Sequence, residues 1–147
     1  MLKQILILLC EKVIQDKNGK ISYIDCFDII NAGSLPVKVG SFCVCSQWRK
    51  TVPGDFYGHA KLTIRSPNGE ETVIVQDELI VKSTTHRLNI DFKDGFVFPW
   101  EGVYAFELCI SKPDKSWEET FTTELSVLKG EPQKTDHNVR VRQDKQA

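Results

Sequence analysis

The segment Val103-Tyr-Ala-Phe-Glu-Leu-Cys-Ile110 alternates large apolar side chains with smaller or polar ones. Its even-numbered residues, from Tyr104 to Ile110, are all large and apolar, whereas Glu107 has the other parity. Successive side chains of a β-strand point to opposite faces, so this pattern predicts a strand with one buried and one exposed side.

The same two-residue period recurs along the chain, and turn sequences separate its repeats. Asn18-Gly19 and the Ser66–Gly69 segment are typical of tight turns between strands. The predicted strands are Ile5–Ile14, Ile21–Ile30, Val39–Trp48, Tyr57–Arg65, Thr72–Val81, His86–Phe92, Val103–Ile110 and Trp117–Leu128. Phe96–Pro99 is predicted as a short extended link, and the last strand as bent or split. The first two strands are apolar on both parities, so we expect both of their faces to be covered.

About eight strands of this kind predict an all-β fold, an antiparallel β-sandwich with an immunoglobulin-like or related topology. Residues 1–129 would form the sandwich domain. After Leu128 the sequence becomes polar, and residues 130–147 are predicted to be a flexible C-terminal tail.

Composition excludes several classes of protein. The chain has 147 residues, 41% of them hydrophobic, with 19 basic and 20 acidic side chains and a net charge of −1. Without a basic excess, no nucleic-acid partner is expected. The apolar run Ile5–Cys10 is shorter than an export signal or a membrane span needs, so no membrane association is predicted. Five cysteines without regular spacing indicate reduced thiols and a cytoplasmic location.

The segment Glu101-Gly-Val-Tyr104-Ala-Phe106 resembles the corner before the sixth strand of immunoglobulin-like sandwiches. The resemblance implies that the hydroxyl of Tyr104 returns to the backbone a few residues upstream and staples the corner. Phe106 occupies the position of the second cysteine of antibody domains, so no disulfide between sheets is implied.

The opening of the chain resembles a family of small uncharacterised bacterial proteins. The residues that carry the resemblance are Leu8-Leu-Cys-Glu-Lys-Val13, Asp16-x-x-Gly19-Lys20, Ser22-Tyr-Ile24, Phe27-Asp28-x-Ile30 and, near the other end, Gly102–Leu108. The resemblance implies a β-sandwich and supplies no reaction.

No catalytic or metal-site pattern stands out. The chain lacks the Gly-x-Ser-x-Gly segment of serine hydrolases and a glycine-rich phosphate loop. Cys43 and Cys45 share one face of a strand, but structural zinc sites use four ligands, so we expect no metal and no cofactor. An enzyme would need a cysteine–histidine pair, for instance Cys43 or Cys45 with His59.

Aromatic residues supply the candidate contacts. The segment Phe96-Val-Phe-Pro-Trp100 predicts either a plug at the end of the sandwich or an exposed patch, with Trp100 and Phe98 as contact residues. Trp48 shares its parity with core residues but adjoins Arg49, and the two are further candidate contacts. The favoured function is a non-catalytic protein-interaction module of a bacterial multi-protein system. Prophage and defence systems are candidates for that system. A second copy of the chain is left open as a partner.

The alternative is a sandwich that binds a small molecule or a glycan. A polar-rimmed cleft beside Trp100 would favour this alternative, whereas a flat apolar patch or an unprotected edge strand would favour the interaction module.

Overall fold

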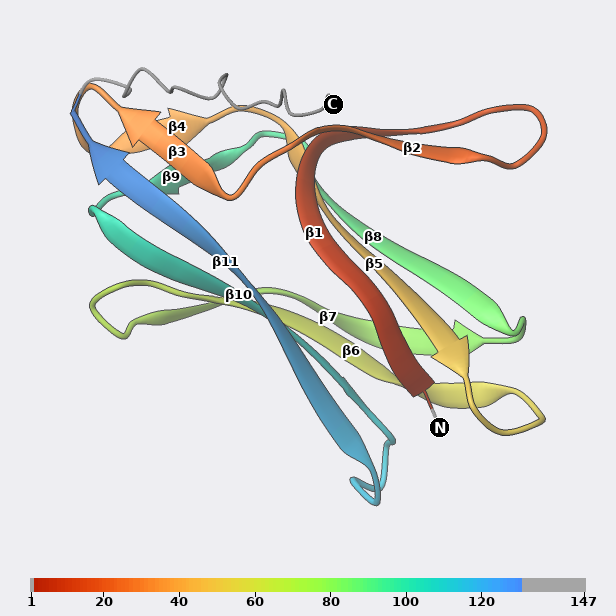
Figure 1. Cartoon of the computed structure of the whole chain (residues 1–147). Helices are drawn as coiled ribbons and strands as arrows, with labels where there is room; N and C mark the ends of the chain where they lie inside the picture. The colour runs from red at the N-terminus through yellow and green to blue at the C-terminus, as the bar shows by residue number, and fades with distance from the viewer. Residues whose placement is uncertain (1, 131–147) are drawn as a thin grey trace, which may run out of the picture.

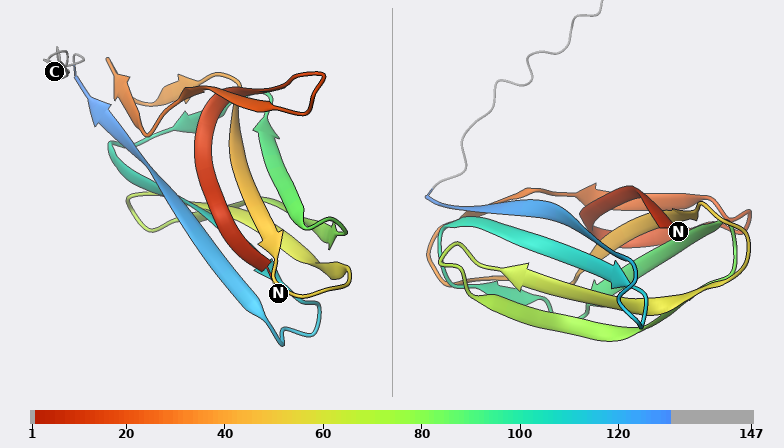
Figure 2. Two further views of the ribbon diagram at one scale, coloured as in Figure 1. Left: turned by 45° about the vertical axis from the view of Figure 1, so that its right-hand side comes forward. Right: turned by 90° about the horizontal axis from the view of Figure 1, so that it is seen from below.

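The computed structural model describes residues 2–130, which form an all-β fold of two packed sheets (Figures 1 and 2). No helix occurs between residues 2 and 130, so the described part of the chain has none that could cross a membrane. The tail predicted at 130–147 lies outside the described residues, apart from Gly130.

The first sheet has four strands and only antiparallel neighbours. Its order is β2 (Ile21–Cys26), β1 (Leu2–Gln15), β5 (Phe42–Lys50) and β8 (Thr85–Phe92). The predicted Asn18-Gly19 turn joins β1 to β2, with Gly19 at a φ of +84°. A side-chain oxygen of Asp16 accepts the backbone N–H of Asn18 in the same turn at 2.8 Å.

The second sheet has five strands and faces the first across the core. Its order is β3 (Ile29–Ala32), β11 (Glu118–Lys129), β10 (Gly102–Ser111), β6 (Phe56–Arg65) and β7 (Glu71–Val81). β3 runs parallel to β11, and the other neighbours are antiparallel. A small third sheet pairs β4 (Val37–Val39) with β9 (Phe96–Phe98).

This order resembles that of immunoglobulin-like sandwiches. β1, β5 and β8 correspond to strands A, B and E, and β11, β10, β6 and β7 correspond to strands G, F, C and C′. The right-hand view of Figure 2 shows the two layers. The structure therefore confirms the predicted sandwich class.

Three predicted elements differ from the structure. The predicted strand Ile21–Ile30 is two strands in different sheets: β2 ends at Cys26, directly after Asp25 with its φ of +55°, and β3 begins at Ile29. β2 is an edge strand without a fully buried residue, and β1 exposes Ile5 and Ile14, so the expectation that both faces of the first two strands are covered is wrong. Phe96–Phe98 pairs as a strand, and the last strand, β11, is continuous.

Aromatic rings join the two sheets at the centre. Phe42 of β5 stacks on Phe92 of β8 at a centroid distance of 4.5 Å. Phe106 of β10 meets both rings edge-on at 6.3 Å. These rings belong to one continuous core that contains buried residues of both sheets.

Tyr104 is buried at the start of β10 and binds the chain that leads into the strand. Its hydroxyl donates to the carbonyl of Trp100 and accepts from the N–H of the same residue, both at 2.9 Å. The staple implied by the Glu101–Phe106 segment is thus present, and it holds the backbone before β10 against the core.

We predict that Tyr104→Phe destabilises the domain by about 1–3 kcal/mol, because the part-buried N–H and C=O of Trp100 lose their partner. Urea unfolding followed by fluorescence measures the change. Tyr57→Phe is the matched control. The Tyr57 hydroxyl is exposed and makes only a 3.3 Å contact with Asp55, so a change within about 0.5 kcal/mol is expected. Equal effects of the two variants would contradict the corner role of Tyr104.

Candidate functional site

The segment around β9 forms a plug with one exposed aromatic residue. Phe98 is fully buried, with its ring edge-on to Tyr104 and to Phe96, both at 4.9 Å. The side chain of Trp100 is 40% exposed. Phe98 is therefore corrected from a contact residue to a core residue, whereas Trp100 keeps an accessible ring.

Trp48 is also fully buried. Its ring lies edge-on to Phe121 at 5.0 Å, and its Nε1 donates to the hydroxyl of Ser46 at 2.9 Å. Trp48 is corrected in the same way, because its face of β5 points into the core. The next residue, Arg49, points to the opposite, outer face and is exposed.

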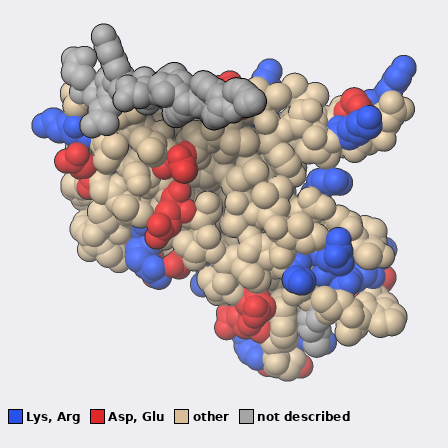
Figure 3. All heavy atoms as spheres, in the orientation of Figure 1, with Lys and Arg blue, Asp and Glu red and all other residues tan. Residues whose placement is uncertain are grey.

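The predicted contact residues do not form one site. β9 and the end of β5, which carries Arg49, lie at opposite ends of the sandwich (Figure 1). Arg49 is the register partner of Lys3 on β1, and Arg87 follows on β8 opposite Gln47. In Figure 3 basic side chains gather at the lower right, where β5 ends.

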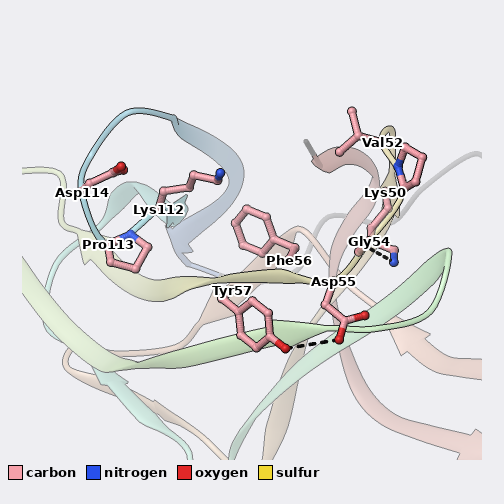
Figure 4. Close-up of a pocket in the computed structure, with 10 residues that line it drawn as sticks. Lys50, Val52, Gly54, Asp55, Phe56, Tyr57, Lys112, Pro113 and Asp114 are labelled. Atoms are coloured by element: carbon pink, nitrogen blue, oxygen red, sulfur yellow. Dashed lines mark hydrogen bonds between the residues drawn. The ribbon is translucent and has the colours of Figure 1, made fainter.

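A pocket opens at this end of the sandwich, between the loop after β5 and the loop after β10 (Figure 4). Its volume is about 420 Å³, and the exposed ring of Tyr57 forms part of its wall. The ammonium group of Lys50 donates to the carbonyls of Gly54 and Lys82, at 2.6 and 3.0 Å, and so fixes the first loop. Pro113 and its charged neighbours Lys112 and Asp114 line the other side.

β7, an outermost strand of the second sheet, lies beside this pocket, and its outer edge has no neighbouring strand among the described residues. Tyr57 on β6 and Ile80 on β7 are register partners, with exposed fractions of 56% and 47%. Val73 and Val75 are exposed further along β7. In β7 only Leu79 and Val81 are buried, and most of its other side chains are exposed.

Cysteine and histidine do not come together as an enzyme would require. Cys43 and Cys45 lie on β5, whereas His59 lies on β6 of the other sheet. Among residues 2–130 no cysteine is hydrogen-bonded to a histidine, and no group of three or more His, Cys, Asp or Glu side chains is placed to hold a metal ion.

A different cysteine lies near His59 in a shallow hollow on the outer face of the second sheet. Cys109 of β10 lines it together with His59, and its Sγ donates to Glu118 at 3.0 Å. Burial, and then the bond to Glu118, raise the pKa of the Cys109 thiol. The group is therefore held as a thiol rather than as the thiolate that nucleophilic chemistry needs.

The sequence interpretation did not identify Tyr57, Ile80 or the β7 edge as contact candidates. A signal was present, because Thr72–Val81 carries apolar side chains on both parities around the acidic pair Asp77-Glu78. This mixture is unusual for a strand with one buried face. The segment could be recognised as an edge strand only once the order of the strands in the sheet was known, and a short stretch of sequence does not reveal that order.

Comparison with known proteins places the chain in a family without supplying an activity. The sequence model of a "Family of unknown function (DUF6941)" matches residues 5–116. No curated protein matches significantly.

Among solved structures, similar folds occur in the beta-glucosidase from Listeria innocua. Its complex with glucose aligns with a TM-score of 0.47 and 6% identity over 87% of this chain, and its complex with isofagomine with a TM-score of 0.47 and 5% identity over 86%. The chain spans 16% of the length of these structures.

We predict that Trp100→Ala leaves the domain folded, at a cost of about 1 kcal/mol or less, because the ring is partly exposed and the corner bonds use its backbone. Trp48→Ala should cost about 3–5 kcal/mol, because it leaves a cavity between the sheets. Thermal unfolding by circular dichroism compares the two. A larger loss for Trp100→Ala than for Trp48→Ala would contradict the assignment of their environments.

Proposed function

Since the chain belongs to DUF6941, a family of unknown function, we propose its role from its own surfaces. The role is that of a non-catalytic protein-interaction module, which binds an extended segment of a partner protein along the free edge of β7. The partner segment would add one strand to the five-stranded sheet.

The free edge of β7 is the observation that carries the proposal. An edge strand presents unpaired backbone N–H and C=O groups, and partner strands recognise such edges through main-chain hydrogen bonds. The pairing of β7 with β6 is regular from Val75 to Val81, after an irregularity opposite Leu62 and Thr63. A regular run of this length offers a partner a continuous template.

The side chains along β7 indicate the chemistry of the partner. Ile80 and Val75 offer apolar contacts, whereas Asp77 and Glu78 between them are exposed and acidic. Opposite charges across neighbouring strands stabilise pairing. The fitting segment is therefore extended, with apolar residues at its ends and lysine or arginine near its centre.

The cellular setting of this role is part of the same proposal. All five cysteines are free thiols, which supports a reducing compartment such as the cytoplasm. The resemblance of the opening residues to small bacterial proteins supports a bacterial multi-protein system, with prophage or defence systems as candidates.

Substitution of two exposed β7 residues by lysine tests the proposal. We predict that the double variant Val75→Lys, Ile80→Lys keeps the fold but loses at least about 90% of the bound partner, because charge on an edge strand blocks pairing. The measurement is quantitative affinity capture from source cells, with Val97→Lys, a valine in β9 about as exposed as Ile80, as the matched control.

Partners retained by wild type and by Val97→Lys but lost by the edge variant support the proposal. A self-association in sedimentation that only the edge variant abolishes would identify the partner as a second copy. Capture profiles that are identical for all three proteins would refute a role for β7.

The pocket of Figure 4 supports a second candidate function, the binding of a small molecule or a glycan. Its volume of about 420 Å³ is within the range of ligand sites. Tyr57 offers an aromatic face on which the apolar side of a sugar ring can pack, and Lys50, Asp55 and Lys112 are polar neighbours. The pocket beside Tyr57 does not include Trp100, so this second candidate differs from the sequence-based alternative, in which Trp100 would line the cleft.

Saturation-transfer NMR against a panel of monosaccharides tests this second candidate. We predict signals for at least one sugar with the wild-type protein and a loss of about tenfold in affinity for Tyr57→Ala, which removes the stacking face. Trp100→Ala, outside the pocket, is the control. A panel without signals, or signals that persist in Tyr57→Ala, would exclude this pocket.

A further inference from the structure

Four of the five cysteines lie together on three neighbouring strands of the first sheet. Cys10 of β1 is the register partner of Cys26 on β2 and also of Cys43 on β5. These three residues, called here the thiol row, are directly opposed across β2, β1 and β5. Cys45 lies two residues beyond Cys43 on the same strand.

Burial changes steeply along the thiol row. Cys26 is exposed at the sheet edge, whereas Cys10 and Cys43 are buried. The buried thiols form a small cluster of their own, separate from the main core, and Leu8, Val13 and Tyr23 pack against it. The row thus leads from the exposed sheet edge to buried thiols.

The sulfur atoms of the cluster are in contact. The Sγ of Cys10 lies 3.4 Å from the Sγ of Cys45, which lies 3.5 Å from that of Cys43. Free cysteines are commonly buried, and it is their reactivity rather than their packing that makes three touching thiols a chemically distinct group.

Strand register decides which of these thiols can form a disulfide. Directly opposed residues of antiparallel strands have Cα atoms about 4.5–5.5 Å apart, within the range of disulfides. Diagonal neighbours such as Cys10 and Cys45 are about 7–8 Å apart, which is too far without backbone movement. Cys10 can therefore pair with Cys26 on one side and with Cys43 on the other.

A pocket gives a small reactant access to the exposed end of the row. It has a volume of about 640 Å³ and is lined by Cys26, Phe27, Ile30 and the carboxylates of Glu11 and Asp25. No basic residue lines it. Such a site favours a reactant that carries positive charge, for example an aminothiol disulfide.

We propose that the thiol row is a site of thiol–disulfide exchange, at which Cys26 reacts with a low-molecular-weight, amine-bearing disulfide and Cys10 resolves the product. The Cys26 thiolate attacks one sulfur of the reactant and releases its other half as a thiol. Cys10 then attacks the sulfur of Cys26, releases the second thiol and forms the Cys10–Cys26 disulfide. Two protein thiols are oxidised, and one disulfide is reduced to two thiols.

The same geometry allows the disulfide to move inward. Cys43 can attack the sulfur of Cys10, which forms a Cys10–Cys43 bond and returns Cys26 to the thiol state. Burial, together with the neighbouring thiols Cys43 and Cys26, raises the pKa of Cys10. The resolving step should therefore accelerate as the pH rises, because only the thiolate attacks.

The test uses cystamine on the full chain, followed by acid quenching, alkylation and mass-spectrometric mapping. We expect a transient adduct on Cys26 and then a Cys10–Cys26 disulfide, formed faster at higher pH. In Cys10→Ser the adduct should persist at least about tenfold longer, and in Cys26→Ser the oxidation of Cys10 should slow at least about tenfold. Glutathione disulfide, which is anionic, should react more slowly than cystamine.

Cys109→Ser, in the other sheet, is the matched control and should behave as wild type. Circular dichroism of each variant verifies the fold, and Cys26→Ala replaces Cys26→Ser if the latter is unstable. A permanent adduct on Cys26 without a Cys10–Cys26 bond would overturn the proposal. A stoichiometric metal ion that protects the row from alkylation would overturn it too, in favour of a metal site.

Discussion

Burial of β5 on both of its faces is the constraint on which the rest of the structure depends. Five consecutive residues, Phe42 to Ser46, are buried, although neighbouring side chains point in opposite directions. Phe42 and Val44 face the aromatic core, whereas Cys43 and Cys45 face the thiol cluster. A slip of one residue would move thiols into the core and aromatic rings to the outer face, so the core fixes the register of the thiol row.

The same core leaves part of the second sheet uncovered. Five strands of that sheet face four strands of the first, and one of those four, β2, belongs to a hairpin that projects from the body in Figure 1. β7 is therefore held by β6 along its length but is buried only near its end, at Leu79 and Val81. Its free edge follows from how the sheets are packed, and its apolar exposed residues make that edge attractive to a further strand.

Short sequence patterns predicted the features that depend on neighbouring residues. The features that they did not predict depend on pairing between distant strands. Two-residue alternation identified strands such as Val103–Ile110, and a six-residue segment predicted the corner of Tyr104. The division of Ile21–Ile30 was not predictable in this way, because β3 is defined by parallel pairing with β11, about a hundred residues away. The burial of Trp48 and Phe98 likewise depends on partners from distant strands, Phe121 and Tyr104.

Partner binding at the β7 edge and thiol exchange at the thiol row use different sheets, so one need not affect the other. The β7 edge belongs to the second sheet, and the thiol row lies on the outer face of the first, behind the core. A disulfide between Cys10 and Cys26 would cross-link β1 and β2 only. Close-packed interiors transmit strain, so an effect on the second sheet would require core side chains to shift. Because Leu9 and Val44 on the core side can keep their positions, oxidation of the row should leave the β7 edge competent to bind. Redox chemistry and partner recognition are then separable properties of one domain, and an influence of either on the other would have to pass through β5.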